Sequence, residues 1–215
     1  MRFSAWSLPG SLYAGICLGR SVSPNRRRQT KASRRLLNST RIFLYDSQTD
    51  VIDPDVETKY PTTFEVLKRA DLDGYFSNSI LKKANGRPRP FVQHPALVQP
   101  LFTAGDFSYP SGHSSGTELQ ARILGTLFPA QSEQLLTRAR QVGDSRVIAG
   151  VHYTSDTLAG IALGDLIFTQ LQAKPKFRHE LSTAAEKDGI PTKQQESAEK
   201  GVAPSPLPRR FTIRS

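Results

Sequence analysis

The sequence predicts an all-α fold, a single-domain helical bundle, and three observations lead to this prediction. Apolar residues recur at helical spacing in a first stretch with Leu119, Ile123 and Leu127, and in a second with Leu135 and Ala139. Proline, glycine and asparagine separate such stretches, as turns require. No segment alternates apolar and polar residues over the length of a strand. At 215 residues, the chain fits one domain with tails.

The first helix is expected to begin at Thr62, because Thr62-x-x-Glu65 fits a capping box and an apolar stripe follows it. A second, short helix is expected over residues 79–84. The next residues, 87–90, read Arg-Pro-Arg-Pro and are expected to be extended, since proline lacks an amide hydrogen and restricts the residue before it. Residues 91–109 are expected to form a loop.

The following helix is expected to start near residues 111–113 and to end before Pro129. Another begins at about Ser132 and carries Arg146 on the same stripe as its apolar residues. An arginine on the apolar side of a helix is unusual at a surface and natural for an internal anion ligand. This position therefore favours a buried anion site.

A last core helix is expected to start at Thr154 or Ser155 and to run to Gln170. Small residues recur along it, which permits close contacts with neighbouring helices. They are Ala159, Gly160, Ala162 and Gly164.

The net charge of +10 is concentrated at the two ends of the chain. Residues 1–45 carry nine Lys and Arg and no acid, residues 173–215 carry a net +4, and the remainder is slightly acidic. The expected organisation is a basic N-terminal arm over 1–45, a helical domain over 46–186, and a disordered, proline-containing basic tail over 187–215. Basic ends of this kind are more often solvated than specific for nucleic acid, so no specific nucleic-acid partner is expected.

The N-terminus leaves two interpretations open. Residues 5–19 are mildly apolar and follow Arg2, which is compatible with a signal segment, whereas Pro9 and the lack of an Ala-x-Ala site argue against one. A wrongly assigned start codon is the alternative. Cys17 is the single cysteine, so no intrachain disulfide can form. No apolar run reaches about eighteen residues, so no membrane span is expected.

Three short segments carry the residues that indicate chemistry. They are Lys82-x6-Arg89-Pro90, Pro110-Ser111-Gly112-His113, and Ser145-Arg146-x5-His152-x2-Ser155-Asp156. Three cations can bind the oxygens of a phosphate group, with the arginines contributing planar forks. Ser111 and Gly112 lie at an expected helix N-terminus, where free amides bind anions. Asp156 lies four residues after His152, so its carboxylate can fix the proton on one ring nitrogen.

In these segments the chain resembles the type 2 phosphatidic acid phosphatase superfamily, and within it the soluble bacterial class A acid phosphatases. The resemblance covers residues 81–177, and every residue that the signature fixes is present in order. It implies a bundle of the acid phosphatase and vanadium haloperoxidase type, with His152 as the nucleophile and His113 as the general acid. It also implies no cofactor and no metal. Phe107-Ser108-Tyr109 and Ser114 depart from the class A pattern, which affects the subclass alone.

The leading hypothesis is metal-independent hydrolysis of phosphate monoesters through a phosphohistidine, with small phosphorylated molecules as substrates. The enzymatic alternatives are a vanadium-dependent haloperoxidase-like enzyme and a phosphatase of lipid phosphates or pyrophosphates. A basic binding protein on a decayed phosphatase scaffold is the non-enzymatic alternative, and the complete residue set argues against decay. By the same resemblance a periplasmic or secreted location is expected. The sequence leaves a homo-oligomer open.

Overall fold

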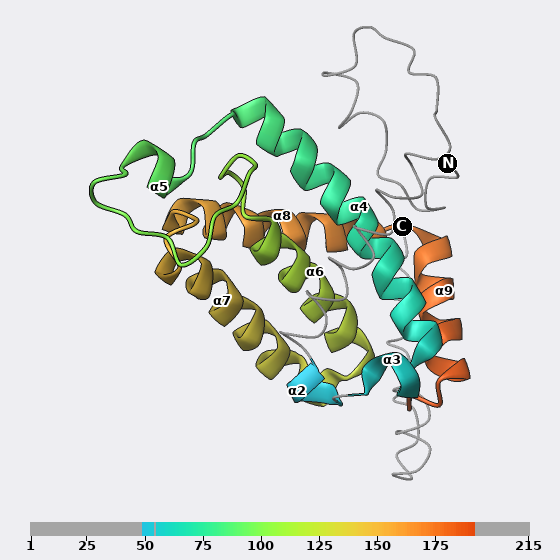
Figure 1. Cartoon of the computed structure of the whole chain (residues 1–215). Coiled ribbons are helices and arrows are strands. Elements are labelled where there is room, and N and C mark those ends of the chain that lie inside the picture. Colours follow the sequence, from blue (N-terminus) through green and yellow to red (C-terminus); the bar gives the residue numbers. More distant parts are fainter. Residues whose placement is uncertain (1–48, 54, 192–215) are drawn as a thin grey trace, which may run out of the picture.

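The computed structural model describes residues 49–53 and 55–191, and the all-α prediction is confirmed there: this part is helical and contains no strand (Figure 1). The expected basic arm and most of the expected tail lie outside the described residues. The elements in chain order are α2 (Thr49–Ile52), α3 (Val56–Lys59), α4 (Pro61–Asn85), α5 (Pro90–Gln93), α6 (Gly112–Leu127), η2 (Pro129–Gln131), α7 (Ser132–Ile148), α8 (Thr154–Gln172) and α9 (Pro175–Lys187).

Helix α4 is one helix of 25 residues, so the expectation of separate helices over this stretch is wrong. The expected capping box is also wrong, because Tyr60 takes the cap position and Pro61 follows it inside the helix. Asp188, far along the chain, supplies the missing cap. Its carboxylate accepts hydrogen bonds from the amides of Thr62, at 3.1 Å, and Thr63, at 2.6 Å. The first turn of α4 therefore depends on a distant carboxylate, which a local motif search does not find.

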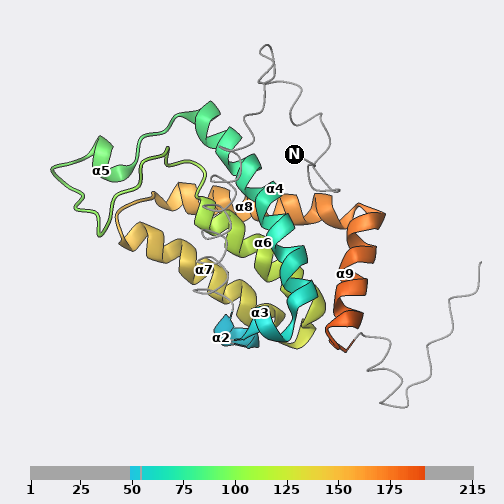
Figure 2. The ribbon, with the colours of Figure 1, turned by 45° about the vertical axis from the view of Figure 1, so that its right-hand side comes forward.

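Helix α6 is the centre of the bundle and packs against α4, α7 and α8, as the two ribbon views agree (Figures 1 and 2). Helix α7 follows α6 after the short turn η2, as the apolar pattern predicts. Helix α8 begins at Thr154, but its cap residue is Tyr153 rather than Thr154 or Ser155. Asp156 accepts a hydrogen bond from the Tyr153 amide at 2.9 Å, so a site residue also caps the helix.

The small residues of α8 allow it to touch α6 directly, as expected. A Cβ atom on Gly160 would lie 2.5 Å from the carbonyl oxygen of Ser111, and one on Gly164 would lie 2.5 Å from that of Ser115. Such distances leave no room for any side chain. Gly160 thus brings α8 against the first turn of α6, where part of the predicted site lies.

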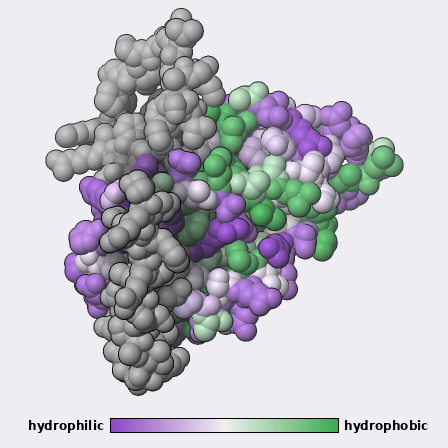
Figure 3. All heavy atoms as spheres, turned by 180° about the vertical axis from the view of Figure 1, so that it is seen from behind, coloured by the Kyte–Doolittle hydropathy of each residue, from purple (hydrophilic) through white to green (hydrophobic). Residues whose placement is uncertain are grey.

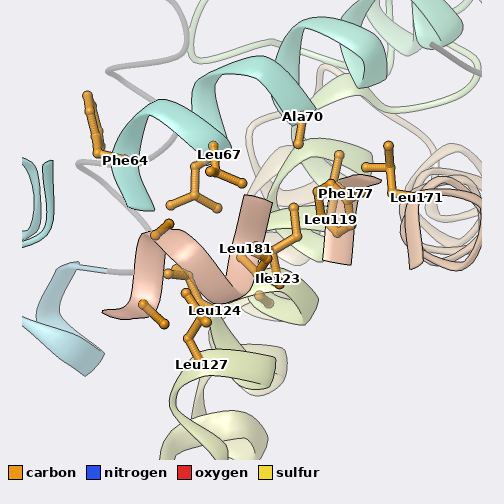
Figure 4. Packing of buried hydrophobic residues seen from close by; sticks show 14 of the residues in the cluster. Phe64, Leu67, Ala70, Leu119, Ile123, Leu124, Leu127, Leu171, Phe177 and Leu181 are labelled. Atoms are coloured by element: carbon orange, nitrogen blue, oxygen red, sulfur yellow. The ribbon is translucent and has the colours of Figure 1, made fainter. Parts of the chain in front are cut away.

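The hydrophobic core lies between α4, α6, α8 and α9 (Figure 4). Phe177 and Leu181 of α9 pack there beside Leu67 and Leu119, and all four side chains are buried. The sequence analysis ends its last helix at Gln170 and assigns no helix to the residues of α9. The predicted tail starts at 187, yet Lys187 ends α9 and Ile190 is buried in the core. Packed structure therefore continues past residue 186.

The segment between α4 and α6 crosses the end of the bundle and contains the short helix α5. Several of its apolar side chains are exposed, including Val92, Leu97 and Leu101. From behind, hydrophobic surface gathers toward the end of the molecule that carries α5 (Figure 3). Among the described residues, no helix has the length and apolar character needed to cross a bilayer.

Candidate active site

A cavity of about 790 Å³ opens between α4, the start of α6 and the segment before it. Five of the predicted site residues line it, although they come from four different parts of the chain. They are Lys82, Arg89, Gly112, His113 and His152. The fold therefore brings all three sequence segments together, with residues of each facing or supporting one cavity.

Lys82 and Arg89 place two buried cations at the same side of this cavity. Lys82 lies in the last turn of α4, and Arg89 is aimed by the extended segment that its two neighbouring prolines enforce. The Arg89 Nε donates to the Asp106 carbonyl at 2.9 Å, and its Nη1 donates to the Val151 carbonyl at 2.7 Å. Burial lowers the pKa of Lys82 below its ordinary value, which the charge of Asp106 partly offsets.

Asp106 faces both cations, and the sequence analysis did not single it out. Its carboxylate pairs with Nη2 of Arg89 and lies 3.3 Å from Nζ of Lys82. Burial tends to raise the pKa of Asp106, but the hydrogen bond from Arg89 and the charge of Lys82 outweigh it and lower that pKa. The available signal was that Asp106 is the single acid between residues 91 and 109, four residues before the second motif begins at Pro110.

His152 and Asp156 form the pair that the four-residue spacing predicts. The Nδ1 atom of His152 lies 3.3 Å from Oδ2 of Asp156, and its Nε2 lies 3.2 Å from Nη1 of Arg89. A guanidinium can only donate, so Nε2 must carry a lone pair and the ring proton must lie on Nδ1, toward the carboxylate. Burial lowers the pKa of His152, which favours the neutral ring. A neutral imidazole with an unprotonated Nε2 is the form that can act as a nucleophile.

Asp156 is fully buried, and two further residues bind it. Ser108 donates to Oδ2 at 2.5 Å, and Arg87 donates to Oδ1 at 2.8 Å while its guanidinium stacks on Tyr153. Burial tends to raise the pKa of Asp156, but the hydrogen bonds from His152, Ser108 and the Tyr153 amide outweigh it and lower that pKa. The carboxylate that orients His152 is thus kept ionised.

Sequence reasoning missed both of these supporting residues. Ser108 stands two positions before the second motif, and Arg87 stands two positions before Arg89. Arg87 occupies an unspecified position of the first segment and Ser108 lies outside all three segments, so only the fold brings them to Asp156.

Ser111 and Gly112 form the start of α6, as predicted. Ser111 is the cap residue and is fully buried, and its side chain accepts a hydrogen bond from the Ser114 amide at 3.3 Å. Its own amide donates to the Asp156 carbonyl at 2.9 Å, so the starts of α6 and α8 are joined. Gly112 faces the cavity, where the N-terminal amides and the helix dipole favour an anion.

His113 and Arg146 complete the predicted set. Burial, together with the positive charges of Arg146 and Arg89, lowers the pKa of His113 from 6.5 to about 4. Arg146 lies in the last turn of α7, half-buried, with its guanidinium 5.7 Å from the ring of Phe102. It is close enough to influence His113, although it is not one of the residues that line the cavity.

Comparison with known proteins identifies the family to which these segments correspond. Residues 72–176 match the family model described as PAP2 superfamily. The non-specific acid phosphatase of Salmonella typhimurium is 35% identical over 133 residues, which cover 59% of this chain and 52% of that protein. The decaprenylphosphoryl-5-phosphoribose phosphatase of Mycobacterium tuberculosis is 33% identical over 85 residues, covering 40% of this chain and 46% of that protein.

The chain spans about half the length of the curated relatives it matches. Among solved structures, a transmembrane PAP2 type phosphatidylglycerolphosphate phosphatase from Bacillus subtilis is 21% identical, with a TM-score of 0.45, over 76% of this chain and 90% of that chain. The family match confirms the superfamily that the three sequence segments indicate.

Proposed function

Because the chain carries a PAP2 superfamily domain over residues 72–176, we propose that it hydrolyses phosphate monoesters through a phosphohistidine on His152, without a metal ion. One observation carries the proposal most strongly: His152, whose Nδ1 faces Asp156 and whose unprotonated Nε2 accepts a hydrogen bond from Arg89, lines a cavity that the buried cations Lys82 and Arg89 also line. The acid phosphatase relatives support the reaction class.

In this proposal the positive charge comes from the protein itself. The phosphoryl group carries negative charge on three oxygens in the transition state, and positioned cations stabilise it there. Lys82 and Arg89 supply two of these cations, the amides at the start of α6 supply further donors, and Arg146 acts from the side of His113. Such a set can supply the charge that a metal ion provides elsewhere.

The first chemical step forms the phosphoenzyme. Nε2 of His152 attacks phosphorus while the bond from phosphorus to the leaving oxygen breaks. Asp156 keeps the ring proton on Nδ1 and stabilises the positive charge that develops on the imidazole. His113 donates its proton to the leaving oxygen, so the alcohol departs neutral.

The second step releases phosphate. A water molecule attacks the phosphohistidine, His113 accepts one of its protons, and the bond between phosphorus and Nε2 breaks. His113 then carries the proton needed for the next cycle. Because its pKa is about 4 before substrate binds, the phosphate charge must raise that pKa for His113 to act as an acid near neutrality.

The decisive experiment is to trap the intermediate with purified full-length protein and p-nitrophenyl phosphate. We expect a phosphoenzyme that is labile in acid and stable in base, absent from His152→Ala, with turnover that survives EDTA and is inhibited by vanadate. Loss of turnover in EDTA with recovery on added zinc or magnesium would overturn the metal-independent mechanism.

A second candidate, hydrolysis of a phosphate with a large apolar leaving group, is favoured by the cavity walls. Tyr75, Phe76 and Phe107 line it, and each is between 42% and 48% exposed. Aromatic side chains this exposed beside a reaction site can contact an apolar group of the substrate. A panel of monoalkyl phosphates with two to twelve carbons separates the candidates: kcat/KM that rises steeply with chain length indicates the apolar substrate class, and a flat profile indicates a non-specific phosphatase.

A further inference from the structure

We propose that Asp106 is an internal competitor for the phosphate: its carboxylate occupies the donors of Lys82 and Arg89 and must leave them when the substrate binds. The inference rests on the proposed function in one respect, namely that these two cations form the phosphate site. It assigns to Asp106 control over how strongly an anion binds.

The argument begins with the donors of Lys82. An ammonium group has three N–H bonds, and three acceptors surround this one. Two are the carbonyls of Phe107 and Ser108, and the third is the Asp106 carboxylate, 3.3 Å away. These carbonyls belong to a backbone segment that is held in place. The Ser108 side chain is buried, and the backbone amide of Ser108 donates a hydrogen bond to the Arg87 carbonyl at 2.8 Å. Only the carboxylate can be exchanged without moving the backbone.

Arg89 leads to the same conclusion. Its Nε donates to the Asp106 carbonyl and its Nη1 donates toward Val151 and His152, which leaves Nη2 as the end of the fork available to a ligand. The Asp106 carboxylate is paired with Nη2. A phosphate oxygen that needs Nη2 and the Lys82 ammonium together therefore meets a carboxylate already there.

Asp106 can rotate into solvent, because it is the exposed member of this cluster. Its side chain is 57% exposed, whereas those of Lys82 and Arg89 are 8% and 6% exposed. It follows Gly105, around which there is open space. A phosphate and a carboxylate on the same two cations would repel each other, so rotation of Asp106 into solvent is the favourable outcome. Before substrate binds, the negative charge of Asp106 reduces the repulsion between the two buried cations.

The test is direct binding of inorganic phosphate to the full-length protein by isothermal titration calorimetry at pH 7, before and after Asp106→Asn. The amide keeps the side-chain shape and the backbone contact with Arg89 but removes the charge. We expect about a tenfold lower dissociation constant for phosphate. Asp106→Glu retains the charge and should bind as wild type, and Glu133→Gln, an exposed charge change at the far end of α7, should have no effect.

A second probe distinguishes displacement from simple repulsion. Dimethyl phosphate carries one negative charge, and inorganic phosphate carries close to two at this pH. If Asp106 leaves the site, the free energy needed to move it is the same for both anions. Asp106→Asn should then lower the dissociation constants of phosphate and of dimethyl phosphate by the same factor. If the affinity for phosphate increases much more than the affinity for dimethyl phosphate, Asp106 stays beside the bound anion. That result would overturn the proposal.

Thermal unfolding in phosphate provides an independent measurement, since a ligand that binds more tightly stabilises the folded state more. Asp106→Asn should show the larger increase in Tm. Equal or weaker phosphate binding in this variant overturns the proposal even if the wild type is an active phosphatase. Tighter binding in a protein that hydrolyses no phosphate ester supports the role of Asp106 and contradicts the proposed function alone.

Discussion

Asp71 offers a quantitative test of the structure, because its carboxyl group is buried beside the cavity without a cation. Gln120 donates to Oδ2 at 2.6 Å, and Oδ1 has no hydrogen-bond partner within the described residues. Burial raises the pKa of Asp71 from 3.8 to about 8. We predict that Asp71→Asn stabilises the protein, and that it does so more at high pH than at low pH.

The magnitude follows from linkage between protonation and folding. An acid whose pKa rises on folding stabilises the protein fully below the unfolded pKa, and this contribution is lost as the pH rises toward the folded pKa. Between pH 5 and pH 8 the unfolded chain has ionised Asp71, whereas the folded protein keeps it mostly protonated. Each pH unit then lowers the free energy of unfolding by about 1.4 kcal/mol, so the wild type loses roughly 3–4 kcal/mol of stability over this range. This corresponds to a change in Tm of about 10 °C for a domain of this size.

The assay is urea unfolding followed by far-ultraviolet circular dichroism at pH 5, 6.5 and 8, for the wild type and Asp71→Asn. The difference in unfolding free energy between the two proteins isolates Asp71 from other groups that titrate. Asp144→Asn, which changes an exposed carboxylate on α7, is the matched control for the loss of one acidic group. A pH-independent difference for Asp71→Asn would refute a raised pKa at this position.

Three further predictions concern catalysis and packing. For His113→Ala, activity on alkyl phosphates should fall far more than on p-nitrophenyl phosphate, whose leaving group departs without a proton; steady-state kinetics check this, and equal losses would contradict the acid role. Because the pKa of His113 is about 4, its protonated fraction grows as the pH falls from 6.5, so wild-type kcat/KM should rise toward acid pH. For Gly160→Ala, the new Cβ would lie 2.5 Å from the Ser111 carbonyl, so we expect about 1–3 kcal/mol of destabilisation together with reduced turnover. Gly105→Ala, in open space, should leave stability unchanged in the same urea titration.

The helices were predictable where local signals determine them. The starts of α6 and α7 follow from apolar periodicity and from Pro129, which act over a few residues. The start of α4 lies within one residue of the expected Thr62, but its cap was not predictable, because the capping carboxylate is Asp188, 126 residues away from Thr62. Helix α9 was missed for a related reason, since its stability depends on contacts with distant parts of the chain. It begins at Pro175, only a few residues after α8, and buries Phe177 and Leu181 in the core.

The candidate site shows the same division. Motif spacing identifies the residues that face the cavity, such as Lys82 and His152, since their chemistry requires particular side chains at particular separations. The residues that support or oppose them, Arg87, Asp106 and Ser108, act through contacts that arise only when the chain has folded. None of the three stands at a position that the motif spacing specifies, so spacing alone does not reveal them.

The Asp188 cap makes two amide protons at one end of α4 sensitive to the position of α9. The amides of Thr62 and Thr63 donate to this carboxylate, whereas no helical carbonyl is available to them so close to the start of α4. Their hydrogen exchange with solvent should therefore report undocking of α9, separately from unfolding of the bundle. Deuterium uptake at these two positions would measure how firmly the last described helix is attached, with no label added to the protein.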